Sequence, residues 1–526
     1  MMRKSAYYVT TPIYYVNDSP HIGHAYTSLA CDVLARFMRL DGHSVMFLTG
    51  TDEHGQKVEK SAAAAGRPPK EFVDEVSGRF RDLTAMMNFS NDDFIRTTED
   101  RHIRSCQELW RRIAANQSPE GRDNIYLDTY GGWYSVRDEA FYADSELIKG
   151  ADGGKLAPSG APVEWVEEPS YFFRLGDWRQ RLLDYYGAPG SGTVMPEGRR
   201  NEVVSFVEGE LFDLSISRTS FSWGIPVPDD EAHIMYVWLD ALTNYITAAG
   251  FPDEESETYK TFWPADLHMV GKDILRFHAV YWPAFLMAAG LAPPKRVFAH
   301  GWWTNEGEKI SKSLGNVIEP ADIVERYGLD QVRYFLLREV PFGNDGDFSH
   351  RAMVGRINSE LANDFGNLAQ RVLSMINKNC AAKMPQAAEL SEADSALLDA
   401  AHGLAGRVRS EIAENHAFHE ALNEIWVFVR MANGYVAEQE PWALKKTDPE
   451  RMATVLNVAA EAIRHLAILA QPFMPESCAK MLDQLGVPDD ARDFSCLGPD
   501  GALKPATKLP PPEPVFPRFV DDAAED

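Results

Sequence analysis

Two short basic motifs stand far apart in the sequence, and both contain residue types that bind phosphate. The first is His21-Ile22-Gly23-His24 and the second is Lys309-Ile310-Ser311-Lys312-Ser313. Imidazole N–H groups and ammonium groups both stabilise negative charge that develops on phosphate oxygens. Either motif alone is weak, because capping histidines and solvated Lys/Ser loops are common. Together they predict a site that holds a triphosphate and stabilises the departing pyrophosphate.

The first motif stands where a strand gives way to a helix. Residues 7–10 form a buried-strand pattern, and from His24 apolar residues recur at helical spacing up to Gly42. Residues 45–48 predict the next strand, so the order is that of half a dinucleotide-binding fold. A helix that begins at the motif adds free backbone N–H groups to the phosphate site. Gly23 has no Cβ and lets a nucleoside lie against the backbone.

Further elements position the second motif. Apolar runs at 234–239, 268–270 and 296–299 predict buried strands, with a helix ending near Gly250 and another from Ile274. The lysines follow the last of these strands, where Gly307 and Gly315 predict a mobile loop. Between 116 and 230 the alternation breaks, which indicates an inserted domain.

The character of the chain changes again at about residue 355. Long patterns rich in Ala, Leu and Glu run to about residue 485 and predict a helical bundle. The proline-rich stretch 510–514 predicts a strap over the surface, and residues 521–526 predict disorder. The predicted fold is therefore α/β, a Rossmann-type parallel-sheet domain with an inserted domain, followed by an α-helical bundle.

Composition limits the classes of protein that fit. The chain has 526 residues, enough for several domains, and its five cysteines form no Cys-x-x-Cys pair. No apolar stretch approaches the ~20 residues that cross a bilayer, and the N-terminus lacks the apolar core of a secretory signal. We therefore expect a cytoplasmic protein with no membrane partner. The net charge of −26 means that any RNA must bind to a local basic face.

Longer strings of residues carry a family resemblance. They are Thr10–Tyr15, Gly50–Gly55, Ser215–Thr219, Tyr236–Ala241, Gly271–Ile274 and Asn367–Arg371. With the two basic motifs, they make the sequence resemble the methionyl-tRNA synthetases, a class I aminoacyl-tRNA synthetase family, over nearly its whole length. The resemblance implies that the protein uses ATP and Mg²⁺ to convert L-methionine to methionyl-adenylate. It implies transfer of methionine to the 3′ end of tRNA(Met), the initiator included.

The resemblance also implies roles for individual residues. Those for ATP binding and catalysis are His21, Gly23, His24, Lys309, Ser311, Lys312 and Ser313, with Arg218 in the activation step. Those for methionine are Ile13, Tyr15, Asp52, Trp238, Ala241, Tyr245, Ile274 and His278. A thioether is apolar and a weak acceptor, so aromatic walls with donors from Tyr15 and His278 suit it. Asp52 binds the ammonium group, and Leu242 stands where some relatives have proline.

The resemblance places anticodon recognition in the helical part. Asn367 and Arg371 are four residues apart and share a helical face. Trp442 matches a tryptophan that stacks on an anticodon base. The alternative is that Trp442 belongs to the core, but its polar neighbours Glu440, Lys445 and Lys446 favour exposure.

One departure from the family concerns metal. Many relatives carry Cys-x-x-Cys zinc knuckles in the inserted domain, whereas no cysteine occurs between Cys106 and Cys380 here. The corresponding stretch, Tyr134–Glu139, offers no thiolate ligands. We therefore expect no zinc, and no metal site other than the Mg²⁺ that accompanies ATP.

The resemblance divides the chain into predicted domains. The catalytic domain covers 1–115 and 231–298, the inserted connective domain 116–230, the stem-contact region with the lysine loop 299–354, and the anticodon-binding domain with its strap 355–526. We expect a monomer, since no appended dimerisation module is visible.

Other functions remain as alternatives. A small-molecule adenylyltransferase shares the histidine site but is usually shorter and lacks the helical part. A non-catalytic tRNA-binding paralogue conflicts with the intact His21, His24, Lys309 and Lys312. The isoleucine, valine and leucine enzymes carry an editing insertion much larger than the segment 116–230.

Overall fold

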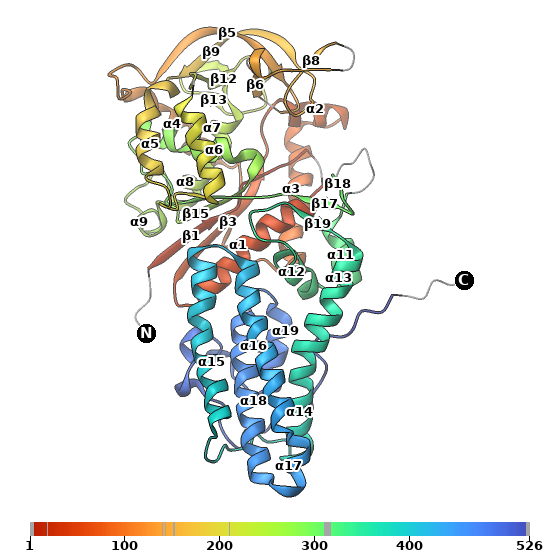
Figure 1. Ribbon diagram of the computed structural model, residues 1–526. Coiled ribbons are helices and arrows are strands. Elements are labelled where there is room, and N and C mark those ends of the chain that lie inside the picture. Colours follow the sequence, from red (N-terminus) through yellow and green to blue (C-terminus); the bar gives the residue numbers. More distant parts are fainter. Residues whose placement is uncertain are drawn as a thin grey trace, which may run out of the picture. The chain divides into compact units, whose positions relative to one another are not determined.

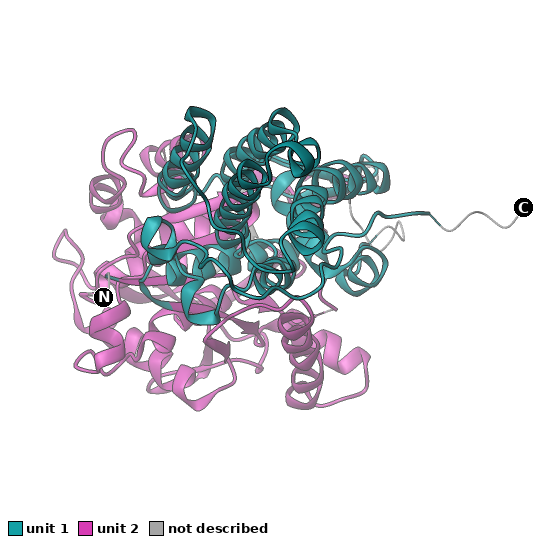
Figure 2. Ribbon diagram, turned by 90° about the horizontal axis from the view of Figure 1, so that it is seen from below, with its two compact units in different colours: residues 1–5, 21–45, 301–526 teal, residues 6–20, 46–300 magenta. Residues whose placement is uncertain are grey.

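In a computed structural model, the described residues are 5–17, 19–138, 140–142, 144–150, 153–209, 211–309 and 317–521. The chain forms two compact units that do not follow chain order. Unit 1 contains residues 1–5, 21–45 and 301–526, and unit 2 contains residues 6–20 and 46–300 (Figure 2). The two basic motifs therefore belong to unit 1, and the residues predicted to bind methionine belong to unit 2.

Unit 2 is built on a parallel sheet, as the sequence predicted. Among the described residues the sheet has seven strands. In spatial order they are β10 (Val194–Met195), β16 (Val297–His300), β15 (Leu267–Gly271), β1 (Ala6–Thr10), β3 (Ser44–Asp52) and β2 (Tyr14–Tyr15), with β4 (Asp93–Arg96) also on β3. The parallel register sets Tyr15 opposite Asp52. Asp52 thus lies at the carboxyl end of its strand, where α/β proteins bind ligands.

Short helices and smaller sheets complete unit 2 (Figure 1). The helices are α2 (Gln56–Ala64), α3 (Pro69–Met86), α4 (Asp100–Ala115), α5 (Arg179–Tyr186), α6 (Glu197–Glu208), α7 (Val237–Leu242), α8 (Asn244–Ala249), α9 (Glu257–Phe262) and α10 (Trp282–Ala288). The inserted segment contains the antiparallel strands β5 (Ile125–Ser135), β6 (Ala140–Tyr142), β9 (Glu164–Phe173) and β11 (Leu214–Ser215), and a small pair, β7 (Ile148–Lys149) with β8 (Lys155–Leu156). A third sheet contains β12 (Ser217–Arg218), β13 (Pro226–Val227) and β14 (Asp230–Met235).

The prediction of a buried strand at 234–239 was wrong. The strand β14 ends at Met235 and pairs antiparallel with β12 and β13, and the rest of the run forms α7. A short apolar run does not distinguish a buried strand from a buried helix. The predicted strands at 7–10, 45–48, 268–270 and 296–299 are confirmed as β1, β3, β15 and β16. The helix predicted from Ile274 is a 3₁₀ turn (Lys272–Ile274), a π-helical segment (Phe277–Tyr281) and then α10.

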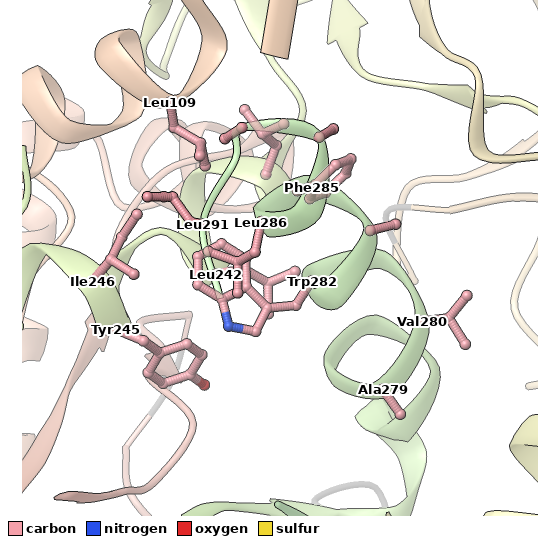
Figure 3. Close-up of a cluster of buried hydrophobic side chains, with 14 of the residues drawn as sticks. Leu109, Leu242, Tyr245, Ile246, Ala279, Val280, Trp282, Phe285, Leu286 and Leu291 are labelled. Carbon is pink, nitrogen blue, oxygen red and sulfur yellow. The ribbon is translucent and has the colours of Figure 1, made fainter. Parts of the chain in front are cut away.

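The core of unit 2 joins these helices to the sheet. Leu242, Tyr245, Trp282 and Leu286 from α7, α8 and α10 pack together there (Figure 3). Leu242 is buried and belongs to this core, which answers how the chain accommodates leucine at the position where some relatives have proline. Burying large aromatic side chains contributes several kcal/mol to stability and holds the pocket helices in place.

Unit 1 contains α1 and the helical bundle predicted from residue 355. Its helices are α1 (Ile22–Leu40), α11 (Pro320–Tyr327), α12 (Leu329–Arg338), α13 (His350–Arg356), α14 (Asn367–Asn379), α15 (Glu392–Arg409), α16 (Phe418–Gln439), α17 (Pro441–Thr447), α18 (Pro449–Ala470) and α19 (Pro475–Gln484), with π-helical segments at Ile357–Gly366 and Ser410–Glu414. A small sheet is formed by β17 (Trp303–Asn305), β18 (Glu308–Lys309) and β19 (Gly346–Phe348).

One helix of unit 1 is apolar enough to cross a membrane. By length and composition α18 passes that test, contrary to the expectation that no apolar stretch approaches this length. In the structure, however, 89% of its apolar window is buried, because α18 packs against α14, α15, α16 and α19. It is therefore the central helix of the bundle.

The C-terminal segment crosses the surface without regular structure, as predicted for a strap. The backbone N–H of Glu513 donates to the side-chain Oε1 of Gln484 on α19 at 2.8 Å. The side-chain Nε2 of Gln484 donates in turn to the backbone carbonyl of Glu513 at 3.0 Å. Residues 522–526, where disorder was predicted, lie outside the described residues.

Candidate active site

The histidine motif caps α1. His21 is the N-cap residue, and its Nδ1 accepts a hydrogen bond of 3.1 Å from the backbone N–H of Gly23. The Nδ1 of His24 accepts one of 3.0 Å from the backbone N–H of His21. A neutral imidazole that accepts at Nδ1 carries its hydrogen at Nε2. The cap therefore fixes both rings in the tautomer whose Nε2–H group donates.

The same geometry keeps the two rings close and disfavours a proton on His24. Their centroids are 3.8 Å apart. Burial and the neighbouring His21 together hold the pKa of His24 well below its ordinary value. A Cβ on Gly23 would lie 3.0 Å from Cε1 of His21, so any larger residue would press against the capping ring. The motif thus places two ring Nε2–H groups at a helix N-terminus, where the backbone favours anions.

The lysine motif begins in the small sheet of unit 1. Lys309 is the last residue of β18, which pairs antiparallel with β17. The predicted loop residues Ser311, Lys312 and Ser313 lie outside the described residues.

The residues predicted to bind methionine come from six elements of unit 2 and their immediate neighbours. Asp52 ends β3, Tyr15 ends β2, and Ile13 precedes β2. Trp238 and Ala241 lie on α7 and Tyr245 on α8, while Ile274 and His278 come from the 3₁₀ turn and the π-helical segment. Ile13, Tyr15, Trp238, Tyr245 and Ile274 all belong to or pack against one hydrophobic cluster. The structure thus brings together residues that are separated by more than 200 positions.

Sequence reasoning did not find Phe277 as part of this region. Its ring is parallel to that of Trp238, with centroids 3.8 Å apart and an interplanar angle of 6°. The rings of Trp238 and His278 form a T-shaped pair with centroids 6.2 Å apart. Phe277 stands three residues after Ile274, and only this spacing from a predicted pocket residue could have indicated it.

The hydrogens of the two predicted sulfur donors are directed elsewhere in this structure. Tyr15 donates its hydroxyl to the carbonyl of His54 at 2.9 Å. The Nδ1 of His278 lies 2.9 Å from the carbonyl of Ile274, so this nitrogen carries the hydrogen. Burial lowers the pKa of His278 to about 4, and its Nε2 then accepts from the Tyr245 hydroxyl at 2.7 Å. The proposed thioether contact is therefore mainly with aromatic walls.

The sequence did not predict a role for the buried carboxylate of Asp240. Oδ2 of Asp240 lies 2.7 Å from Nδ1 of His54, and Oδ1 lies 2.7 Å from Nε2 of His102. Burial by itself raises the pKa of Asp240. The two imidazoles have the opposite and larger effect, so the pKa of Asp240 is lowered to about 2. The ionised group joins α7 to α4 and to the turn that follows Asp52. Asp240 and His54 both lie in strings that suggested the family.

The same cluster contains three groups of the types that bind metals. One donor atom each of His102, Cys106 and Asp240 lies within 4.8 Å of the others. The 2.7 Å between His102 and Asp240 is a hydrogen-bond distance, and burial raises the pKa of the Cys106 thiol well above its ordinary value. A protonated thiol is a poor ligand, so this cluster fits a hydrogen-bonded network better than a metal ion.

The turn where relatives carry zinc ligands is closed by hydrogen bonds. The backbone N–H of Asp138 donates to Oγ of Ser135 at 3.2 Å, and the Tyr142 hydroxyl donates to Oδ2 of Asp138 at 3.1 Å. These side chains contain no thiolate or imidazole.

Arg218 is buried in unit 2 near the end of the inserted segment. Its Nη1 donates to Oγ of Ser215 at 2.7 Å and to the carbonyl of Ser217 at 2.6 Å. Its guanidinium also lies 4.7 Å from the centre of the Tyr236 ring, just before α7. These contacts fix the side chain beside the segment that carries Trp238.

The helical bundle contains a pocket of about 290 Å³. It is lined by Gln370, Arg371, Ser374, Met375, Val436 and Trp442. Two of the three residues predicted to read the anticodon thus share one pocket, whereas Asn367 is not among its lining residues. Trp442 is 45% exposed, so the alternative that it belongs to the core is wrong. Nη2 of Arg371 is 3.4 Å from Oδ1 of Asn433 on α16.

Comparison with known proteins identifies the family. A family model described as class I tRNA synthetases (M) matches residues 7–373. The chain belongs to the methionyl-tRNA synthetase family. A second model, described as the anticodon-binding domain of methionyl tRNA ligase, matches residues 384–526.

Individual members of the methionyl-tRNA synthetase family match over the whole chain. The methionine–tRNA ligase of Mesorhizobium japonicum is 56% identical, with 99% of both chains covered. That of Mycobacterium bovis is 53% identical, with 98% of both covered. The solved structure of Mycobacterium tuberculosis methionyl-tRNA synthetase in complex with methionyl-adenylate matches with a TM-score of 0.94 at 53% identity, covering 98% of this chain and 100% of that one. The free form of that enzyme gives 0.88.

Proposed function

We propose that the protein activates L-methionine with Mg-ATP to form methionyl-adenylate and pyrophosphate, and transfers the methionyl group to tRNA(Met), including the initiator. The observation that carries the proposal is full-length similarity to methionine–tRNA ligases, combined with a capped histidine pair that offers two N–H donors. The bundle and its pocket favour this reading over a small-molecule adenylyltransferase, which needs no such part.

The proposed chemistry has separate roles for the two basic motifs. In this proposal the carboxylate of methionine attacks the α-phosphate, and the Nε2–H groups of His21 and His24 stabilise the charge that develops there. Lys309 and Lys312, with Ser311 and Ser313, hold the pyrophosphate that leaves. Mg²⁺ enters with ATP as part of the substrate, and Arg218 assists the activation step.

The proposed methionine site combines one charge with apolar walls. Asp52 is 5% exposed, and its carboxylate would bind the substrate ammonium in a dry environment. Ile13, Tyr15, Trp238, Ala241, Tyr245, Ile274 and His278 would enclose the thioether side chain. A polarizable sulfur gains dispersion energy against aromatic rings.

The proposed tRNA contact is the pocket beside Trp442. An anticodon base would stack on its exposed indole, and Arg371 would donate to the edge of the base. Asn367, one turn before Arg371 on α14, would contact the adjacent backbone or base. The local cations Arg371, Lys445 and Lys446 would attract the tRNA phosphates despite the negative net charge of the chain.

Other parts of the proposal concern assembly and location. We propose a cytoplasmic monomer that needs no zinc, with the domain boundaries given above. Purified protein that contains stoichiometric zinc and loses activity on chelation would contradict the zinc-free proposal. Light scattering of the purified protein decides between monomer and dimer.

The decisive experiment is pyrophosphate exchange with each of the twenty amino acids. Methionine should stimulate exchange best, and any other amino acid in first place would refute the proposed specificity. Lys312→Ala should then lower kcat for exchange far more than it raises KM for ATP, because the ammonium acts in the transition state. An unchanged kcat would show that the lysine loop is only a solvated surface.

A further inference from the structure

The helix that carries the two histidines is anchored to the bundle by a buried ion pair. Asp32 lies in the middle of α1 and Arg333 lies on α12, and both side chains are fully buried. Nη2 of Arg333 donates to Oδ2 of Asp32 at 2.7 Å. Both residues belong to unit 1, although 301 positions of sequence separate them.

Arg333 also binds a third element. Its Nε donates to the carbonyl of Phe473 at 3.0 Å, and its Nη2 donates to the carbonyl of Pro472 at 2.9 Å. These carbonyls lie in the turn between α18 and α19. One planar guanidinium therefore joins α1, α12 and the bundle in a single fixed geometry, which a lysine cannot reproduce.

Two further contacts fix the direction of α1. Phe37 packs against Phe494 with ring centroids 4.8 Å apart. At the end of the helix, Arg409 of α15 donates to both oxygens of Asp41, at 3.0 and 2.7 Å. Near the other end of the helix, the backbone N–H of Ile22 donates to the carbonyl of Ile318 at 3.1 Å, and Tyr26 packs against Trp303 and Phe342, with ring centroids 5.5 Å apart in each case. The ion pair is thus the buried polar anchor in the middle of a helix that unit 1 also contacts at both ends.

The ion pair between Asp32 and Arg333 fixes geometry more than it adds stability. Replacing a buried ion pair by well-packed apolar residues is often neutral or stabilising, so a net gain in stability does not explain this one. Apolar surfaces can slide, whereas a charge pair with two additional carbonyl acceptors has one arrangement. At 1.5 Å per residue, His21 lies about 16 Å from Asp32, so a tilt of about 4° moves it by about 1 Å. Misplacement by 1 Å in a catalytic site costs as much as a hundredfold in rate.

We propose that Asp32 and Arg333 are positioning residues for the activation step. They hold α1 so that His21 and His24 meet the α-phosphate, and they make the orientation of α1 a property of the helical bundle. The inference rests on the proposed function, in which these histidines act on ATP. Neither Asp32 nor Arg333 contacts the substrate in this proposal.

The test replaces Asp32 by asparagine, which keeps the shape and removes the charge. The measurement is methionine-dependent pyrophosphate exchange by the full-length protein, with the number of active sites titrated by adenylate formation. Asp32→Asn should lower kcat per active site by about ten- to a hundredfold. KM for methionine should stay within about twofold.

A matched control comes from the same helix. Arg36 donates to Asp32 at 2.8 Å from one turn away on α1, and its contact with Asp32 does not bridge to the bundle. Arg36→Gln should leave kcat per active site within about twofold. If Asp32→Asn lowers thermal stability but not the rate per active site, the ion pair is only structural and the proposal is wrong.

A second variant decides the matter if Asp32→Asn does not fold. Arg333→Lys keeps the charge but cannot serve Asp32 and both carbonyls together, and it should lower kcat per active site at least tenfold. An unchanged kcat in Arg333→Lys refutes the proposal. Wild-type protein is assayed first, so absence of methionine-dependent exchange there refutes the proposed function and is distinguished from failure of the variants.

Discussion

The two compact units hold their functional groups by different physical means. In unit 1 the histidines are set by a helix cap and the helix by a buried ion pair, so polar contacts fix positions. In unit 2 the predicted methionine residues are set by the packing of aromatic rings and one buried carboxylate. Phosphate chemistry needs a few donors placed accurately, whereas binding a thioether needs a complementary apolar shape. The division teaches that chain order does not define these units, since α1 lies between β1 and β3 in sequence yet belongs with the bundle.

The largest expected effect tests the polar side of this comparison. His24→Asn keeps an acceptor for the backbone N–H of His21 but removes the Nε2–H donor. We expect kcat for pyrophosphate exchange to fall by about 10²–10³, with KM for methionine unchanged. Steady-state exchange at varied methionine and ATP measures both. A kcat within threefold of wild type would mean that His24 is only a cap.

The next largest effect should appear in tRNA aminoacylation but not in amino-acid activation, because it concerns a residue of the bundle. Trp442→Ala should lower kcat/KM for tRNA by about ten- to a hundredfold, because a stacked base contributes ~1–3 kcal/mol. Pyrophosphate exchange precedes tRNA binding and should not change. Both half-reactions are assayed after circular dichroism establishes folding. A parallel fall of both would make Trp442 structural, and no fall in either would move the anticodon contact to Asn367 and Arg371.

A smaller effect tests the buried carboxylate of unit 2. Asp240→Asn weakens the link between α7 and the turn after Asp52, so KM for methionine should rise about tenfold, or 1.4 kcal/mol. KM for ATP should stay near the wild-type value. Asp266→Asn, at a partly exposed site in the same unit, serves as the control. Equal rises in both Michaelis constants would show a general loss of structure instead.

The smallest expected effect is on the pH dependence of stability, and it comes from one buried histidine in each unit. Burial lowers the pKa of His278 in unit 2 and of His465 in unit 1, each to about 4. Below pH 6.5 the unfolded chain binds a proton that the folded histidine does not, so stability is lost as pH falls. Each histidine should make unfolding easier by about 0.7 kcal/mol between pH 7 and pH 6. Urea unfolding at both pH values should show a weaker pH dependence for His278→Asn and for His465→Asn, and an unaltered slope would contradict the prediction.

The sequence predicted the parallel sheet and the bundle because their patterns are long or repeated. The residues proposed for methionine came from strings shared with a family, and the structure brings several of them, such as Tyr15, Trp238 and Tyr245, to one hydrophobic cluster. It failed at residues 234–239, where a few apolar residues fit a strand and a helix equally well. It did not indicate that Asp240 meets two histidines from distant segments, because such contacts arise only when the chain folds. The tautomers of His21 and His24 likewise depend on backbone hydrogen bonds that no pattern of residue types specifies.

The apolar helix α18 has a consequence for the life of the protein in the cell. It covers faces of α14, α15 and α16, which precede it in the chain and leave the ribosome first. A chain that stops before residue 449 therefore presents uncovered apolar surfaces, the kind of surface that chaperones and proteases bind. Premature termination after residue 470, where α18 ends, would spare that helix and leave the bundle mostly covered. Quality control should thus discriminate sharply between truncations on either side of α18.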